Sequence, residues 1–347
     1  MIDIKKRKAI WNSFYDLATP VNRLILVNVR DGMPERPMLW WERADARVEW
    51  ALARYQRQLE LMELVDDHTV PSLNLLTGTE VFAEAFGCPV HRPADNNPYA
   101  RPCVFGPDEA ARLKIPRVED TKFMILFDMA RRLRERAGKD ALLSFPDIQT
   151  PADVAALIWE KSDFYASMIE EPEVVREFIG KIRTFLFAFL DLWFGEFGPA
   201  TMAHYPDYYL DGGVSVSEDE IGVVGASMYR DFFEDDLRLL SQRYGGIGIH
   251  SCADSRHQWE NLKRAPGLRL INLHRNAAQT LASFAAFGRT CALMPMPSER
   301  VDFDAAPESL TCHIADARPQ AATVDEARRI ADLFYERYPQ MSVYAGR

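Results

Sequence analysis

The stretch Gly246-Ile-Gly-Ile-His-Ser-Cys-Ala-Asp254 lies in the middle of the pattern that decides the fold. Its apolar run, 246–249, suits a buried strand and ends in polar residues. Further apolar runs and amphipathic helical segments alternate on both sides of it, at 213–217, 227–243, 258–264, 268–273, 277–287 and 289–294. Strands that alternate with helices in this way predict a mostly parallel sheet with crossover helices.

The same alternation extends toward both ends of the chain. Helices are predicted at 44–64, 79–86, 121–137, 152–193 and 324–338, and strands at 69–76, 141–145 and 310–314. We predict a (β/α)8 TIM barrel over residues 65–347 with an N-terminal helical extension over 1–64. An open, doubly wound sheet is the alternative. The segment 88–116 is rich in proline and long for a connection, which is typical of a functional lid.

The composition narrows the class of protein. The chain has 347 residues and a net charge of −10 at pH 7, which argues against binding to nucleic acid. The longest apolar run, 185–194, is half the length of about 20 residues that a membrane span needs. Five sparse cysteines and a basic start without an apolar region favour a reduced, cytoplasmic protein.

His250 and Cys252 are the most informative pair of residues. They are two positions apart at the end of a predicted strand, so their side chains point to the same side. In a barrel, both side chains could therefore face one site at the carboxyl-end mouth, where active sites lie. Imidazole and thiolate together suit Zn²⁺. Cys312, in Leu310-Thr-Cys-His-Ile314, is the candidate third ligand, and Cys291 is the alternative.

Carboxylates and an amide also gather near predicted strand ends. Asp147 and Gln149 follow the strand at 141–145, while Asp211, Glu218 and Asp219 flank the strand at 213–217. Where such ends converge they form a polar pocket. We assign Asp147, Asp211 and Asp219 as candidate catalytic residues, and Gln149 and Glu218 as candidate substrate-binding residues. Helix caps and solvated loops are the alternative for each of them.

Three segments together resemble the uroporphyrinogen decarboxylase superfamily. They are Thr77-Gly-Thr-Glu-Val-Phe-Ala-Glu-Ala-Phe-Gly-Cys88, the stretch from Ser217-Glu-Asp-Glu-Ile-Gly222 to Met228-Tyr-Arg-Asp-Phe-Phe233, and Ile249-His-Ser-Cys-Ala-Asp254. The resemblance runs from about residue 65 to the C-terminus. It implies a (β/α)8 barrel with its site at the carboxyl-end mouth.

Within that superfamily the chain resembles the cobamide-dependent methyltransferases more than the true decarboxylases. The Arg-Gln-Ala-Gly-Arg motif that grips porphyrin carboxylates is absent. The zinc site of the methyltransferases resembles His-x-Cys plus a later Cys in a Gly-Cys-x-Ile context. His250 and Cys252 match the first part, and Cys312 matches the second with Thr311 in place of the glycine.

The resemblance implies a zinc-dependent methyltransferase component of a corrinoid system. It would move a methyl group between a small-molecule donor or acceptor and a cobalamin. The chain lacks a corrinoid motif such as Asp-x-His-x-x-Gly, so the corrinoid would arrive on a partner protein. The alternatives are a metal-free decarboxylase or lyase on the same barrel and a non-catalytic barrel that binds a ligand or a corrinoid protein.

Overall fold

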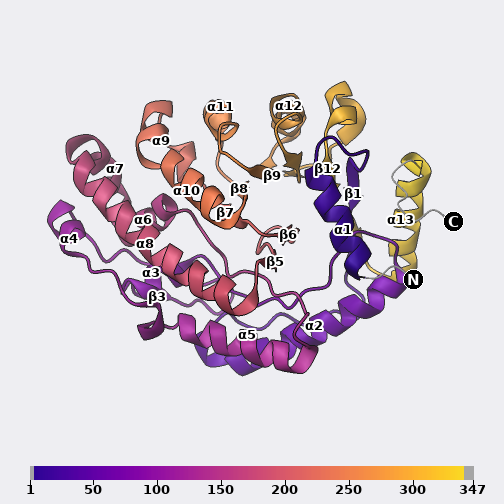
Figure 1. The fold of residues 1–347 in the computed structure, drawn as a ribbon, viewed down its shortest axis with the longest axis horizontal. Coiled ribbons are helices and arrows are strands. Elements are labelled where there is room, and N and C mark those ends of the chain that lie inside the picture. Colours follow the sequence, from indigo (N-terminus) through magenta and orange to yellow (C-terminus); the bar gives the residue numbers. More distant parts are fainter. Residues whose placement is uncertain (1–3, 340–347) are drawn as a thin grey trace.

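The computed structural model describes residues 4–339, and Figure 1 shows helices arranged around a set of central strands. The helices are α1 (Ile4–Tyr15), α2 (Ala44–Leu64), α3 (Glu80–Ala85), α4 (Pro107–Arg112), α5 (Phe123–Ala137), α6 (Pro151–Ile158), α7 (Lys161–Glu170), α8 (Pro172–Phe197), α9 (Ala226–Phe232), α10 (Glu234–Tyr244), α11 (Trp259–Leu262), α12 (Ala277–Phe287) and α13 (Val324–Arg337). The strands are β1 (Arg23–Ile25), β2 (Asn28–Val29), β3 (Val90–His91), β4 (Tyr99–Ala100), β5 (Ala200–Met202), β6 (Tyr209–Asp211), β7 (Val214–Ser217), β8 (Ile247–Ser251), β9 (Leu268–Arg275), β10 (Ala292–Leu293), β11 (Met296–Pro297), β12 (Ile314–Asp316) and β13 (Gln320–Ala321).

The central strands form a closed ring of eight parallel segments. Six of them are hydrogen-bonded in the order β1-β12-β10-β9-β8-β7. Two extended segments, around Leu73 and 142–149, complete the ring through single bridges from Leu73 to Leu143 and from Gln149 to Ser217. The ring closes where the His68 N–H donates to the Ile25 carbonyl. The predicted TIM barrel is confirmed, and the open sheet is excluded.

A hairpin made of β5 and β6 enters the interior of this ring. Met202 in β5 bridges Ser144, and Tyr208 donates a hydrogen bond of 2.9 Å to Ser215 on the inner face of β7. The hairpin packs against inward-facing strand residues such as Leu24 and Leu270, and α1 completes the same apolar cluster through Trp11. The middle of the barrel is therefore filled by the hairpin, whose tip at 203–208 points to the carboxyl ends of the strands.

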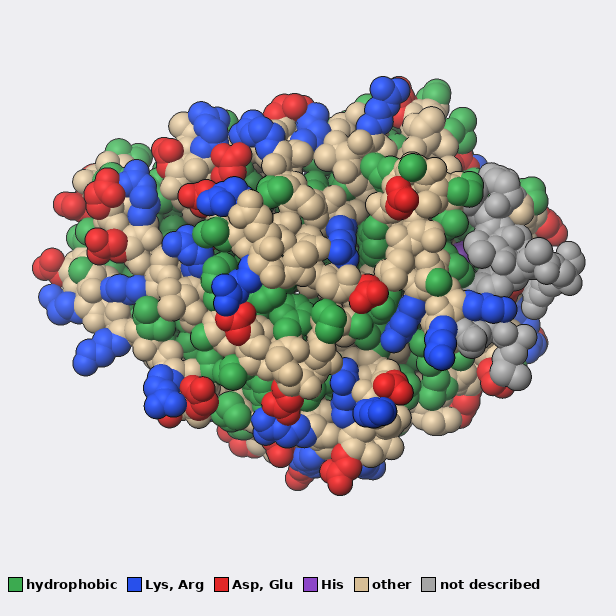
Figure 2. Space-filling view, viewed as in Figure 1, with side chains coloured by type: hydrophobic (Ala, Val, Ile, Leu, Met, Phe, Trp, Pro, Cys, Tyr) green, Lys and Arg blue, Asp and Glu red, His purple; other side chains and the backbone are tan. Residues whose placement is uncertain are grey.

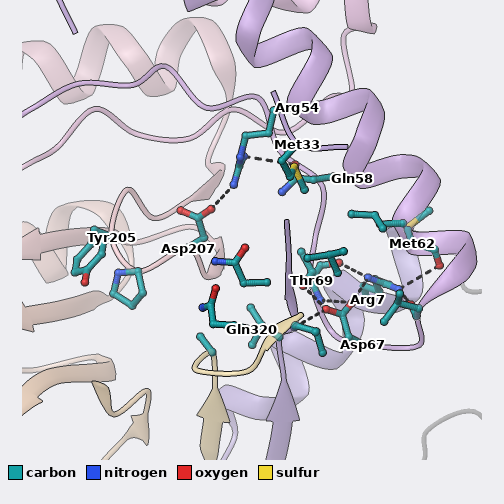
Figure 3. A pocket seen from close by; sticks show the side chains of 18 of the residues that line it. Arg7, Met33, Arg54, Gln58, Met62, Asp67, Thr69, Tyr205, Asp207 and Gln320 are labelled. Carbon is teal, nitrogen blue, oxygen red and sulfur yellow. Dashed lines mark hydrogen bonds and ion pairs between the residues drawn. The ribbon is translucent and has the colours of Figure 1, made fainter. Parts of the chain in front are cut away.

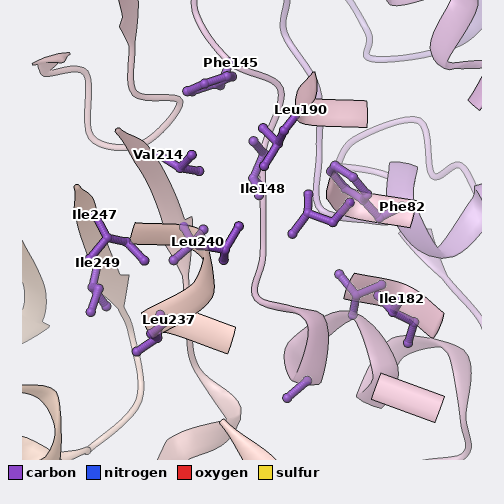
Figure 4. Packing of buried hydrophobic residues seen from close by; sticks show 14 of the residues in the cluster. Phe82, Phe145, Ile148, Ile182, Leu190, Val214, Leu237, Leu240, Ile247 and Ile249 are labelled. Atoms are coloured by element: carbon purple, nitrogen blue, oxygen red, sulfur yellow. The ribbon is translucent and has the colours of Figure 1, made fainter. Parts of the chain in front are cut away.

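The larger apolar core lies between the strands and the outer helices. Figure 4 shows Val214, Ile247 and Ile249 of the sheet against Leu237 and Leu240 of α10. These strand residues alternate with inward-facing ones because successive side chains of a strand point to opposite faces. Alternation therefore places His250 inside the barrel and its neighbours Ile249 and Ser251 in the outer layer.

Two predictions about the chain's organisation are corrected. The boundary at residue 64 does not divide the fold, because β1 lies within 1–64 and pairs with β12. The predicted strand at 310–314 is a 3₁₀ turn over Pro307–Thr311 followed by the start of β12 at Ile314. Pro307 is well suited to a first helical turn, and the turn that it begins extends through Thr311 into the predicted strand.

The described residues contain no helix that is both long and apolar enough to cross a membrane. On the face shown in Figure 2, acidic and basic side chains are interspersed, without a large area of either sign.

Candidate active site

The candidate active site lies at the carboxyl-end mouth of the barrel, where the hairpin tip meets the ends of three strands. The tip brings His204 and Tyr205 upward between Asp147, which follows the 142–145 segment, and His250 of β8. His204 Nε2 lies 3.7 Å from the Asp147 carboxylate. The ring of Tyr205 meets the ring of His250 edge-on, with centroids 5.0 Å apart.

His250 and Cys252 face each other across the end of β8, as their spacing predicts. His250 Nε2 lies 3.0 Å from Cys252 Sγ. The other ring nitrogen, Nδ1, is hydrogen-bonded to the side-chain oxygen of Asn272, which is directly opposite in β9. The Asn272 amide in turn donates to the Met294 carbonyl. This chain of bonds fixes the orientation of the imidazole and directs Nε2 toward the thiol.

Asp219 stands beside this pair, held by a buried carboxylate. Its backbone N–H donates to Asp153 in the first turn of α6 at 2.6 Å, and the N–H of Glu220 donates to the same carboxylate at 3.1 Å. The Asp219 side chain accepts the backbone N–H of Cys252. Burial first, and then the Asp219 and Asp147 carboxylates, raise the pKa of the Cys252 thiol, while Arg275 lowers it.

Asp147 is the second carboxyl group at the mouth, beside Asp219. Its backbone N–H donates to the Thr77 hydroxyl at 2.6 Å, which holds it beside His204. Burial raises the pKa of Asp147, and the nearby His204 and His250 partly oppose that rise. A carboxyl group in this setting holds its proton closer to neutral pH than an exposed one does, as a general acid requires.

The three remaining candidates, one amide and two carboxyl groups, lie in three different places. Gln149 lies at the mouth, where it bridges Ser217, and its side-chain oxygen has no hydrogen-bond partner. Glu218 has the outward parity of Val216, so its fully buried side chain lies in the outer layer. Asp211 precedes β7 at the opposite, amino end of the barrel, where its carbonyl accepts from Arg269 at the start of β9. The structure thus brings neither Glu218 nor Asp211 to the mouth.

Cys312 is also placed away from His250 and Cys252. It precedes β12 at the amino end of the strands, and three strand spacings separate β12 from β8. Its Sγ donates to the Glu308 carbonyl at 3.1 Å, and burial raises its pKa to about 11. Cys291 is buried just before β10, at the same end. As folded, neither cysteine can share an ion with His250 and Cys252 at the carboxyl end of β8.

The residues of the mouth fit part of a zinc site. His250 and Cys252 would supply nitrogen and sulfur ligands from successive inward positions, and Asn272 orients the imidazole as zinc-bound histidines require. Within residues 4–339, however, no three His, Cys, Asp or Glu side chains are grouped closely enough to hold an ion. Asp219 is the carboxylate that joins this hydrogen-bond network, because its side chain accepts the backbone N–H of Cys252.

A chamber of about 450 Å³ is lined by Tyr205, whose ring contacts His250 (Figure 3). One wall comes from α2, and the other comes from the segments that follow β1, β10 and β12. Its charges are paired: Arg54 bonds Asp207 at 2.7 Å, and Arg7 bonds Asp67 at 2.8 Å. The remaining lining combines apolar side chains with amides, among them Met33, Pro34, Trp50, Leu61, Met62, Met296, Asn28, Gln58 and Gln320.

Sequence reasoning missed several of the residues that build this site. Asn272 carried a readable signal, because it is an amide in the middle of the apolar run 268–273 and nothing in a buried strand would otherwise satisfy it. His204 and Tyr205 gave no such signal. They reach the mouth only because the hairpin is folded into the barrel.

A closed parallel barrel with convergent polar residues at its carboxyl-end mouth belongs to the class of TIM-barrel proteins with enzyme-like sites. The model of the uroporphyrinogen decarboxylase (URO-D) family matches residues 62–294. The chain therefore belongs to this family, as the sequence motifs predict.

The comparison with solved structures agrees on the fold. A methyltransferase from Methanosarcina mazei superposes with a TM-score of 0.67 at 13% sequence identity, and the match covers 96% of this chain and 100% of that chain. No protein of curated function matches the sequence.

Proposed function

We propose that the protein is a methyltransferase that moves a methyl group between a small molecule in the chamber and a corrinoid carried by a separate protein. The observation that carries this proposal is the convergence of His250 Nε2 and Cys252 Sγ at the mouth, with Asn272 fixing the imidazole. The fold of a methyltransferase that shares this architecture adds support.

We propose Zn²⁺ as the metal, with His250 and Cys252 as two of its ligands and Asp219 as the third in place of Cys312. The Asp219 carboxylate already accepts a hydrogen bond from the backbone N–H of Cys252, and carboxylates are ordinary zinc ligands. When bound, zinc would lower the pKa of an acceptor thiol or act as a Lewis acid toward a methylated substrate.

The chain's own residues would divide the remaining work. The chamber admits a small, uncharged or weakly polar molecule, because its arginines and aspartates are already paired. Tyr205 lines the chamber and contacts His250, so it would position the reacting group toward the pair. Asp147, with His204 beside it, would exchange a proton with the heteroatom that loses or gains the methyl group.

The Asp147–His204 pair also favours a second candidate, a metal-free lyase or decarboxylase. A carboxyl group whose pKa is raised by burial, next to an imidazole, would serve as an acid–base pair without any metal. Zinc content separates the two candidates, because only the methyltransferase requires it.

The test starts with metal analysis of protein purified without chelator. We expect about one Zn²⁺ per chain, lost in Cys252→Ala and reduced in Asp219→Ala. Cys312→Ala is the matched control, since this cysteine lies at the other end of the barrel, and it should keep its zinc. Full occupancy in Cys252→Ala would eliminate the proposed site.

Activity is then followed through the absorbance of the cobalt centre. Methylcobalamin is mixed with thiols, and cob(I)alamin with a panel of O-methyl and N-methyl compounds. The zinc-loaded wild type should change the spectrum with at least one partner, whereas Cys252→Ala should not. Equal behaviour of the two proteins across the panel would rule out the methyltransferase and leave the lyase or the non-catalytic binding barrel.

A further inference from the structure

A second pair of cysteines lies outside the active site. Cys88 and Cys103 have their sulfur atoms 3.4 Å apart, and neither takes part in the proposed methyl transfer. Cys88 is buried just after α3, while Cys103 is half-buried. The chain between them, 89–102, forms the proline-rich part of the predicted lid.

Ordered backbone holds both cysteines in place. β3 and β4 pair antiparallel between them, and Arg101 N–H donates to the Pro89 carbonyl at 2.8 Å. Cys103 N–H donates to the Ile158 carbonyl, at the end of α6, at 2.9 Å. The contact between the two sulfurs is therefore set by neighbouring hydrogen bonds rather than by a free loop.

We propose that Cys88 and Cys103 are a redox-active dithiol that oxidises to an intramolecular disulfide. The oxidant is a small-molecule disulfide such as oxidised glutathione. The Cys103 thiolate attacks one sulfur of the oxidant and releases one glutathione thiol. The Cys88 sulfur, after losing its proton, then attacks the Cys103 sulfur and releases the second glutathione. Two electrons and two protons pass to the oxidant, which becomes two thiols.

Solvent exposure and thiol acidity make Cys103 the attacking cysteine and Cys88 the resolving cysteine. Cys103 is accessible enough to meet an oxidant, and buried Cys88 can be reached only from within the protein. The sulfur–sulfur hydrogen bond lowers the pKa of Cys103 and raises that of Cys88. A more acidic, partly accessible attacking thiol and a buried resolving thiol are the arrangement that exchange requires.

The disulfide would join two segments that support the active site. α3 begins just after Thr77, whose hydroxyl holds the Asp147 backbone. α6 carries Asp153, which holds the Asp219 backbone. The crosslink would connect Cys88, just after the end of α3, to Cys103, whose backbone is hydrogen-bonded to the end of α6.

The test uses Cys252→Ser as the background, because Cys252 is the exposed cysteine and would form its own glutathione adduct. The folded protein is treated with oxidised glutathione, denatured, alkylated and digested for mass spectrometry. We expect a peptide linked through Cys88 and Cys103, with a mass loss of two hydrogens. Cys291 and Cys312, both buried, should escape the oxidant and be recovered as alkylated thiols.

Adding Cys88→Ser to this background is the matched control. Cys103 should then accumulate as the glutathione adduct, because its resolving partner is gone. Dithiothreitol should reverse both products. Recovery of Cys88 and Cys103 as free thiols in the Cys252→Ser protein, or of Cys103 only as the adduct while Cys88 stays free, would overturn the proposal. Treating the wild type in parallel provides the same readout if the background variant folds poorly.

Discussion

Arg7 is the best residue for testing how α1 is held against the segment 62–69, which follows α2 and leads into the barrel. Its guanidinium is 1% exposed and bonds the Asp67 carboxylate at 2.8 Å. The same group donates to the carbonyls of Thr69, Val65 and Met62. Replacing it in Arg7→Met keeps most of the volume but removes the cation paired with the buried Asp67 carboxylate and takes one donor from each of three carbonyls. Asp67 keeps its hydrogen bonds from the Val27 and Thr69 backbone, so the lost charge pairing dominates the effect.

The expected loss follows from burial. Breaking a buried ion pair by removing one partner costs about 3–5 kcal/mol, because the remaining charge is uncompensated. A protein of this length has an unfolding entropy of about 0.7 kcal/mol per degree. The melting temperature of Arg7→Met should therefore fall by about 4–7 °C.

Thermal unfolding of both the variant and a surface control measures this difference. Arg238→Met removes an ion pair to Asp235 whose side chains are 42% and 75% exposed. Such pairs contribute about 0–1 kcal/mol, so this variant should lose about 1 °C or less. Equal losses in the two variants would refute the reasoning from burial.

The remaining predictions concern the site, the outer layer and the barrel interior. Asn272→Ala should weaken Zn²⁺ binding by about 10–100-fold in chelator competition, because the imidazole loses its orienting partner, and an unchanged affinity would contradict this role. Burial first, then nearby carboxylates, raise the pKa of Glu218, so it binds its proton more tightly in the folded state and costs stability as pH rises above its unfolded pKa of about 4.3. The melting temperature of Glu218→Gln relative to wild type should thus increase from pH 5 to pH 8, and a constant difference would show that the carboxyl does not titrate in this way. Gly248→Ala would place a methyl group 2.0 Å from the Tyr208 hydroxyl and should cost about 1–3 kcal/mol in urea unfolding, whereas Gly225→Ala, with nothing within 4 Å, should be near neutral.

Local periodicity predicted much of the fold. The helix expected at 44–64 is α2, and that expected at 277–287 is α12, because both have a clear apolar stripe. The strands expected at 69–76 and 141–145 contribute only isolated bridges to the ring. A short apolar run shows that a segment is buried, but the hydrogen bonds it makes depend on neighbours that are distant in sequence.

The candidate site was predictable only where it depends on one strand. The spacing of His250 and Cys252 requires nothing beyond the alternation of β8, and the structure brings them together. The third ligand depends on how strands are ordered and at which end each side chain lies. Cys312 resembles a ligand in sequence context, yet its position before β12 places it at the amino end.

The hairpin of β5 and β6 has a consequence for how this barrel can change. In most TIM barrels the interior is filled by side chains from every strand, so altering the floor of the active site means altering several strands at once. Here one contiguous segment brings His204, Tyr205 and Asp207 to the floor of the mouth and to the chamber. Exchange of a few adjacent codons can therefore give the pocket a new shape while the ring that supports it is inherited unchanged.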